Sequence, residues 1–225
     1  MSDRIIVINP NSNDGVTQAM DAAVAPLRMA GGPEIECVTL AEGPPGIETQ
    51  RHVEQVVAPL CRLAEQQHNR AAAFVVGCFS DPGLHALREA TAKPVFGIGE
   101  SGLLTALTLG NAIGIISILA AGVARHRRYA RALGIDGRIA GDIPIGLGVS
   151  ELARDDEVGR RMIAVGRRLI DERGADVIVM GCAGMARQRG VLEAALRVPV
   201  VDPTPAAVGA AIAAVRLGYR QNMQA

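Results

Sequence analysis

Short apolar runs alternate along this chain with longer segments in which apolar residues recur every three or four positions. Runs rich in Val and Ile are typical of strands buried on both faces of a parallel sheet, and the amphipathic segments predict helices that cover those faces. The expected strands are residues 4–8, 35–40, 72–76, 94–98, 112–119, a strand and loop at 137–148, 175–180 and 199–202. The expected helices are residues 14–29, 47–67, 82–92, 99–110, 122–133, 151–173, a short helix after 185, and 204–217. This alternation predicts an α/β fold.

One pattern occurs twice. An apolar strand ends in Gly77-Cys78 in the first half of the chain and in Gly181-Cys182 in the second, and a turn of small residues then leads into a helix. The two cysteines are 104 residues apart, and Pro94 and Pro199 are 105 apart. This spacing predicts two pseudo-symmetric βα lobes, each with a parallel sheet flanked by helices. Because ligands bind at the carboxyl ends of parallel strands, we expect the active site in the cleft between the lobes.

Composition narrows the class of protein. The 23 basic and 23 acidic residues balance, aromatic residues make up 2% of the chain and Trp is absent, so nucleic-acid or anionic-membrane partners are not expected. No apolar run approaches the roughly 20 residues of a membrane span. The first strand begins directly after Met1-Ser2-Asp3, so no signal peptide is expected. The four cysteines show no CxxC or zinc-ligand spacing, so we expect a cytoplasmic protein with reduced thiols and no metal site.

The two Gly-Cys turns are the predicted site of chemistry. Helix N-termini lower the pKa of nearby thiols, so we expect pKa values near neutrality for Cys78 and Cys182. Two thiols on opposite walls of a cleft suit the removal of a proton from one face of a stereocentre and its return on the other. The turns Phe79-Ser80-Asp81 and Ala183-Gly184-Met185 can supply N–H donors to the enolate oxygen that develops. Because no Rossmann, P-loop or metal-ligand motif is present, we expect no cofactor.

Other polar residues have structural explanations beside functional ones. The loop at residues 9–13 either caps the next helix or directs an Asn side chain at a ligand, and the sequence leaves both open. Glu100 suits the first turn of a helix, so it is a second-tier site candidate. His85 follows Cys78 in the next helix, where a His is more often structural than catalytic. Cys37 and Cys61 are expected to be inert packing residues.

A basic cluster consists of Arg125-His126-Arg127-Arg128 together with Arg131. Because it lies in one short helix of a neutral chain, we predict that it forms a solvated face or a subunit contact rather than a phosphate site. This cluster and the Ala- and Gly-rich helices are compatible with a homo-oligomer. His52 and His68 are also expected to lie on a solvated face.

Four motifs in order resemble those of the aspartate/glutamate racemase superfamily, most closely its hydantoin racemase branch, which includes allantoin racemases. They are Asn9-Pro10-Asn11-Ser12, Gly77-Cys78-Phe79-Ser80-Asp81-Pro82-Gly83-Leu84, Gly97-Ile98-Gly99-Glu100 and Gly181-Cys182-Ala183-Gly184-Met185. The resemblance covers nearly the whole chain.

The resemblance implies a cofactor-independent racemase of a hydantoin-like or amino-acid-derived small molecule. It implies that Cys78 and Cys182 are the acid/base pair, and that Asn11 and the backbone after each Cys hold carbonyl or carboxylate groups of the substrate. The substrate-binding residues that it implies are Asn11, Phe79, Ser80, Asp81, Ala183 and Gly184. It further implies a last helix that returns to the first lobe, which gives residues 1–96 plus 205–225 as one lobe and 97–204 as the other.

Relatives with the same motifs catalyse other reactions. Arylmalonate decarboxylases are similar but carry only one of the two cysteines, so the presence of both argues against decarboxylation. Maleate isomerases keep both, one as nucleophile and one as acid, and are an alternative. A non-catalytic small-molecule binding protein is another, although matched thiols favour an enzyme. Gly46-Ile47-Glu48 also stands where many hydantoin racemases have Ser-Ile-Glu, which leaves the pocket for the substrate's side chain open.

Overall fold

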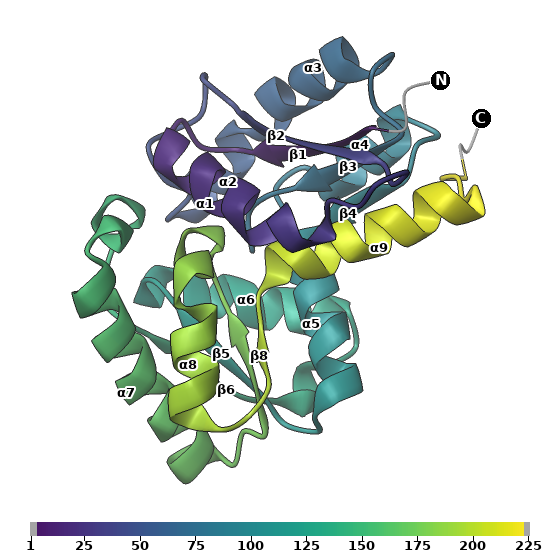
Figure 1. Cartoon of the computed structure of the whole chain (residues 1–225). Coiled ribbons are helices and arrows are strands. Elements are labelled where there is room, and N and C mark those ends of the chain that lie inside the picture. The colour runs from purple at the N-terminus through teal and green to yellow at the C-terminus, as the bar shows by residue number, and fades with distance from the viewer. Residues whose placement is uncertain (1–3, 223–225) are drawn as a thin grey trace.

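Two parallel sheets of four strands form the framework of the chain, which the computed structural model describes from residue 4 to residue 222 (Figure 1). The strand order is β2-β1-β3-β4 in the first sheet and β6-β5-β7-β8 in the second. Strands β1, β3, β5 and β7 are almost wholly buried, as their unbroken apolar runs require. The predicted α/β fold, with two parallel sheets flanked by helices, is confirmed.

Each sheet comes from one half of the chain. The first half contains β1 (Arg4–Asn9), α1 (Asp14–Val24), β2 (Glu34–Thr39), α2 (Gln50–Gln55), α3 (Val57–Gln67), β3 (Ala73–Val76), α4 (Leu84–Ala90), β4 (Val95–Gly97) and α5 (Ile98–Leu109). The second contains β5 (Ile113–Ser117), α6 (Ala120–Ala132), β6 (Ile139–Pro144), α7 (Asp155–Arg173), β7 (Val177–Met180), α8 (Arg189–Leu196), β8 (Val200–Val201) and α9 (Pro203–Leu217). Short 3-10 helices lie at Ala25–Leu27, Asp136–Arg138, Val149–Ala153 and Ala183–Gln188.

The two halves repeat one strand register. Ile8 of β1 lies opposite Val76 of β3, and Ile116 of β5 lies opposite Met180 of β7. In both sheets the next residues along the second strand are Gly-Cys. Because the strands are parallel, both cysteines emerge at the carboxyl edge of their sheet, where ligands bind.

One apolar core joins the two lobes. Val16 and Met20 of α1 belong to the same buried cluster as Leu152 and Met185 of the second half. Helix α1 packs against Ala183–Gln188, the segment that follows Cys182. The first lobe therefore supports the Cys182 turn of the second.

The last helix crosses back toward the start of the chain. Helix α9, yellow in Figure 1, packs against β1, β3 and β4 of the first sheet and against α5. Its first residue follows Asp202, whose carboxylate caps the helix by accepting a hydrogen bond from Thr204 N–H at 3.0 Å. The exact lobe boundaries, after residues 96 and 204, stay predictions.

Three expected helices were too long by at least three residues at one end, and proline explains two of them. The helix expected at 14–29 ends at Val24, before a 3-10 turn that contains Pro26. The helix expected at 47–67 begins only at Gln50 and divides at Val56, because Pro59 has no N–H and its ring clashes with the carbonyl of Gln55. The helix expected at 151–173 begins at Asp155, after the 3-10 turn.

The absence of a signal peptide was inferred from residues 1–3, which lie outside the described residues. Between residues 4 and 222, no helix is long and apolar enough to cross a membrane.

Candidate active site

The two Gly-Cys turns have the same main-chain construction. Gly77 N–H donates to the Ile8 carbonyl at 2.8 Å, and Gly181 N–H donates to the Ile116 carbonyl, also at 2.8 Å. A Cβ at Gly181 would lie 2.8 Å from the Ile116 oxygen, and one at Gly77 would lie 3.0 Å from the Ile8 oxygen. Glycine at 181 therefore avoids a clash with the neighbouring strand, and glycine at 77 leaves room for that strand and for the Met20 side chain.

Each turn also holds its thiol in the same way. The Ser80 N–H lowers the pKa of Cys78, and the Gly184 N–H lowers that of Cys182, each N–H lying two residues after its cysteine. The Ser80 hydroxyl also lowers the pKa of Cys78. These two predicted N–H donors thus stabilise negative charge on sulfur.

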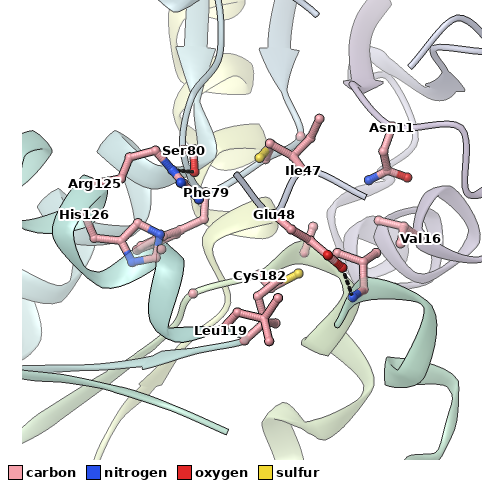
Figure 2. Close-up of a pocket in the computed structure, with 17 residues that line it drawn as sticks. Asn11, Val16, Ile47, Glu48, Phe79, Ser80, Leu119, Arg125, His126 and Cys182 are labelled. Atoms are coloured by element: carbon pink, nitrogen blue, oxygen red, sulfur yellow. Dashed lines mark hydrogen bonds between the residues drawn. The ribbon is translucent and has the colours of Figure 1, made fainter. Parts of the chain in front are cut away.

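Both cysteines border one pocket between the lobes (Figure 2). The empty space in and at the mouth of the pocket is about 490 Å³, which includes open solvent. Apolar side chains from both lobes form most of the wall: Val16, Ile47, Phe79, Ile118, Leu119 and Val149. The polar side chains in the wall are Asn11, Glu48, Ser80, Arg125 and His126.

Most of the predicted site residues lie in this pocket. Besides both cysteines, the wall contains Asn11, Phe79, Ser80 and Ala183. Asp81 and Gly184 are not part of the wall, and Gly184 borders a second hollow that Arg187 also lines. Neither Glu100 nor His85 borders the pocket.

Asp81 fastens the Cys78 turn to the rest of the protein. Its carboxylate accepts hydrogen bonds from Gly99 N–H at 2.9 Å, Glu100 N–H at 2.7 Å and the Tyr129 hydroxyl at 2.7 Å. A Cβ at Gly97 would lie 2.2 Å from the Asp81 carboxyl carbon, so glycine there makes room for this side chain. Asp81 therefore has a structural position, although it had been predicted to bind substrate.

Burial controls the ionisation of this cluster. It raises the pKa of Asp81 to about 7, against the lowering effect of the three hydrogen bonds. Burial and the neighbouring Asp81 carboxylate also raise the pKa of Tyr129, so its hydroxyl stays protonated and donates. Glu100 meanwhile pairs with Arg88 at 2.8 Å, which accounts for that side chain without a role in the pocket.

The loop after β1 serves as both a cap and a pocket wall. Asn13 accepts from Gly15 N–H at 3.0 Å and so caps α1. The oxygen of Asn11 accepts from Asn13 N–H at 2.9 Å and from Asn9 Nδ2 at 3.1 Å. This fixes the amide orientation of Asn11 and turns its nitrogen toward the pocket (Figure 2). The two interpretations of this loop therefore apply to different Asn residues.

Two members of the basic cluster lie in the pocket, so the prediction of a solvated or subunit-contact face was wrong for them. Arg125 reaches from α6 across the cleft and donates its Nε–H to the Ser80 hydroxyl at 2.8 Å (Figure 2). His126 is buried edge-on against Phe79, with ring centroids 5.1 Å apart. Arg127, Arg128 and Arg131 are exposed, as predicted.

A buried network holds His126. Its Nδ1 lies 2.8 Å from the Asp142 carboxylate, whose other oxygen accepts a hydrogen bond from the Ser117 hydroxyl. Because the carboxylate is an acceptor, Nδ1 carries the proton in this contact. The network fixes the ring that packs on Phe79, next to Cys78.

Glu48 closes the pocket on the side of Cys182. Its Oε1 accepts from Val149 N–H at 2.8 Å, which links the two lobes (Figure 2). A Cβ at Gly46 would lie 2.7 Å from the Val149 Cβ, and one at Gly148 would lie 2.9 Å from Glu48 Oε1. Gly46, the departure from the Ser-Ile-Glu pattern, thus lets these segments meet.

The thiol pKa values are not near neutrality, so that expectation was wrong. Burial raises the pKa of Cys78 to about 11 and that of Cys182 to about 12. Loss of hydration outweighs the N–H groups of Ser80 and Gly184, which lower the two values. Arg125 also lowers the pKa of Cys78, whereas Cys78 and Glu48 raise that of Cys182.

The other two cysteines are separate from this site. Cys37 is in β2, where burial raises its pKa to about 12, and Cys61 is in α3. Within residues 4–222, no group of three or more His, Cys, Asp and Glu side chains could hold a metal ion.

Comparisons with known proteins show the family of this chain. The family model described as "Asp/Glu/Hydantoin racemase" matches residues 5–211. The chain belongs to this racemase family. It is therefore an isomerase, and its relatives place it in the hydantoin racemase branch.

Two sequence relatives and one solved structure show how far the similarity to these racemases extends. The hydantoin racemase of Paenarthrobacter aurescens is 33% identical over 97% of this chain and 94% of its own length. The hydantoin racemase of Pseudomonas sp. strain NS671 is 34% identical over 97% of this chain and 88% of its own length. The allantoin racemase structure from Klebsiella pneumoniae superposes with a TM-score of 0.92 at 29% identity, over 97% of this chain and 90% of that one.

Three polar residues of this racemase pocket were missed in the sequence, namely Glu48, Arg125 and His126. The duplication held a signal for the last two. Helix α6 comes after β5 in the second half, just as the loop and helix α1 come after β1 in the first half. The first turns of α6 should therefore reach the cleft, as residues 9–16 do. The basic cluster was instead interpreted as a solvated face because the chain has no net charge.

Proposed function

We propose that this racemase interconverts the enantiomers of a 5-substituted hydantoin or a related amino acid derivative by two-base proton transfer between Cys78 and Cys182, without a cofactor. The observation that carries the proposal is that equivalent turns of two pseudo-symmetric lobes present both thiols to one pocket. The relatives named as hydantoin and allantoin racemases support the substrate class.

In this mechanism one sulfur is a thiolate and the other a thiol. The thiolate removes the proton from the stereogenic carbon, and the electron pair moves onto the adjacent carbonyl to form an enolate. The opposite thiol then delivers its proton to the other face of the carbon. The two sulfurs exchange protonation states, and proton exchange with solvent restores either starting form.

Other pocket residues suit the binding of such a ring. The amide nitrogen of Asn11 can donate to the carbonyl on which the enolate charge develops. One oxygen of Glu48 is held by Val149 N–H, and its other oxygen can accept from a ring N–H of the substrate. The apolar wall excludes water, which strengthens both interactions.

Polarimetry tests this function. The purified chain should abolish the optical rotation of enantiopure allantoin or 5-substituted hydantoins at neutral pH, and exhaustive dialysis against EDTA should leave the rate unchanged. Activity that returns only when a divalent metal is added would overturn the cofactor-free mechanism. Maleate belongs in the same panel, because its conversion to fumarate without any racemisation would favour the isomerase alternative.

A further inference from the structure

Arg125 brings a positive charge to the pocket, and no carboxylate among residues 4–222 forms an ion pair with it. Only its Nε–H is used in a hydrogen bond among residues 4–222, and the acceptor is the uncharged Ser80 hydroxyl. The neighbouring carboxylate of Asp142 is occupied by His126 and Ser117. No ion pair to Arg125 occurs in the described part of the chain, although the same helix pairs Arg131 with Asp136 at 3.5 Å.

The surroundings leave the free edge of this guanidinium open. A Cβ at Gly122 would lie 3.2 Å from His126 Cε1 and 3.6 Å from Arg125 Nη2, so glycine leaves space beside both side chains. Gly122 and Arg125 both border the pocket, so glycine here keeps a side chain from covering the Nη groups. A half-buried guanidinium with two free Nη groups is suited to bidentate contact with a carboxylate.

The pocket is also charged unequally along its length. Arg125 and Ser80 lie on the side of Cys78, and Glu48 lies on the side of Cys182, with apolar walls between them. A neutral hydantoin ring can satisfy Asn11 and Glu48, yet it offers no negative charge to Arg125. The pocket is therefore complementary to a substrate with one acidic end.

We propose that Arg125 determines specificity by binding a carboxylate of the substrate, so that this racemase prefers carboxylate-bearing derivatives over neutral hydantoins. The proposal rests on the racemase function proposed above and adds the substrate class. The carboxylate has two chemical sources, namely an acidic C5 substituent of an intact hydantoin ring or the α-carboxylate of a ring-opened N-carbamoyl amino acid. Both would form the same pair of N–H···O bonds with the guanidinium.

A pair of nearly isosteric substrates tests the proposal. Hydantoin-5-acetate and hydantoin-5-acetamide differ by one charge, and we expect kcat/KM to favour the acetate by about 10- to 100-fold in the wild type, as for a charged hydrogen bond. N-carbamoylalanine is the third substrate, and it tests whether the carboxylate comes from a ring-opened N-carbamoyl amino acid. Arg125→Gln should remove the preference, and Arg125→Lys should keep part of it.

The control is Arg127→Gln, an exposed residue two positions along the same helix, which should leave the preference unchanged. Equal rates for acetate and acetamide in the wild type would overturn the proposal. So would an Arg125→Gln variant that slows both substrates equally, because Arg125 would then act on Cys78 or the enolate, which all substrates share.

Calorimetry separates this proposal from the proposed function. If the wild type racemises none of these compounds, the function has failed, and the binding of the acetate and acetamide still tests Arg125. Acetate binding at least 10-fold tighter than acetamide binding, lost in Arg125→Gln, would support the carboxylate site. Equal binding would overturn it.

Discussion

In the first lobe the thiol of Cys78 lies beside Arg125 and Ser80, whereas in the second lobe the thiol of Cys182 lies near Glu48. The backbones of the two turns nevertheless match, from the Gly N–H bond to the neighbouring strand to the N–H donor two residues after each Cys. The comparison shows that the duplicated main chain positions two equivalent sulfurs, while side chains that are not duplicated give them different charge environments.

The support of each turn comes from the other lobe. Helix α1 of the first lobe packs on the segment after Cys182, and α6 of the second lobe bonds to Ser80 and Asp81 after Cys78. The contacts differ in kind, since α1 contributes apolar Val16 and Met20, while α6 contributes polar Arg125 and Tyr129. Polar contacts fix direction more strictly than apolar ones, so we expect substitution of the supporting side chains from the other lobe to disturb the Cys78 turn more than the Cys182 turn.

The largest expected effect is the loss of racemisation when either pocket cysteine is replaced. Cys78→Ala and Cys182→Ala should each lower racemisation by about 10²- to 10⁴-fold, because each removes one of two acid/base groups. Cys37→Ala and Cys61→Ala are the controls and should change only stability, by about 1 kcal/mol. Polarimetry measures racemisation, and urea denaturation measures stability. Substantial racemisation by Cys78→Ala or Cys182→Ala would contradict the two-thiol mechanism.

The pH profile tests the raised thiol pKa values. With thiol pKa values of about 11 and 12, the base is mostly protonated at neutral pH. The thiolate fraction, and with it kcat/KM, should rise about tenfold per pH unit from pH 7 to 9. Because the equilibrium constant of racemisation is one, both enantiomers must give the same kcat/KM profile. A plateau reached below pH 8 would show that the working enzyme has a thiol of near-neutral pKa.

The glycine before each cysteine gives a smaller effect on stability. Gly181→Ala should destabilise the fold by about 1–3 kcal/mol, because its Cβ would lie 2.8 Å from the Ile116 carbonyl oxygen. Gly77→Ala should cost less, since the nearest obstacle is the flexible Met20 side chain, at 2.7 Å. Gly190 has nothing within 4 Å, so Gly190→Ala is a neutral or stabilising control. A larger loss for Gly77→Ala than for Gly181→Ala would contradict this order.

Asp81 gives the smallest expected effect, and it depends on pH. Its folded-state pKa of about 7 lies above the usual carboxyl value, so its contribution to stability is complete below about pH 4 and is lost as the pH rises through about 7. Asp81→Asn should therefore cost about 1–2 kcal/mol near pH 5 and less near pH 8. Urea denaturation at both pH values measures this trend, and a cost that grows with pH would show that the ionised carboxylate is the stabilising form.

Periodicity and duplication were enough to predict the fold and the location of the cysteines, because apolar runs and Gly-Cys ends depend on local sequence. Contacts between segments that lie far apart along the chain were not predicted. Neither the Asp81–Tyr129 bond nor the Arg125–Ser80 bond could be predicted, since each joins residues more than 40 positions apart. The thiol pKa values were missed for the same reason, because burial depends on the whole fold.

Deuterium exchange with single Cys→Ser variants tests the central claim most directly, that Cys78 and Cys182 act on opposite faces of one stereocentre. Each variant is incubated with each pure enantiomer in D2O near neutrality, and NMR follows the loss of the α-proton against the rate without enzyme. Serine stays protonated at this pH, so each variant keeps one effective base. The account predicts that neither variant racemises its substrate, and that Cys78→Ser and Cys182→Ser exchange opposite enantiomers. Exchange of the same enantiomer by both variants would contradict it.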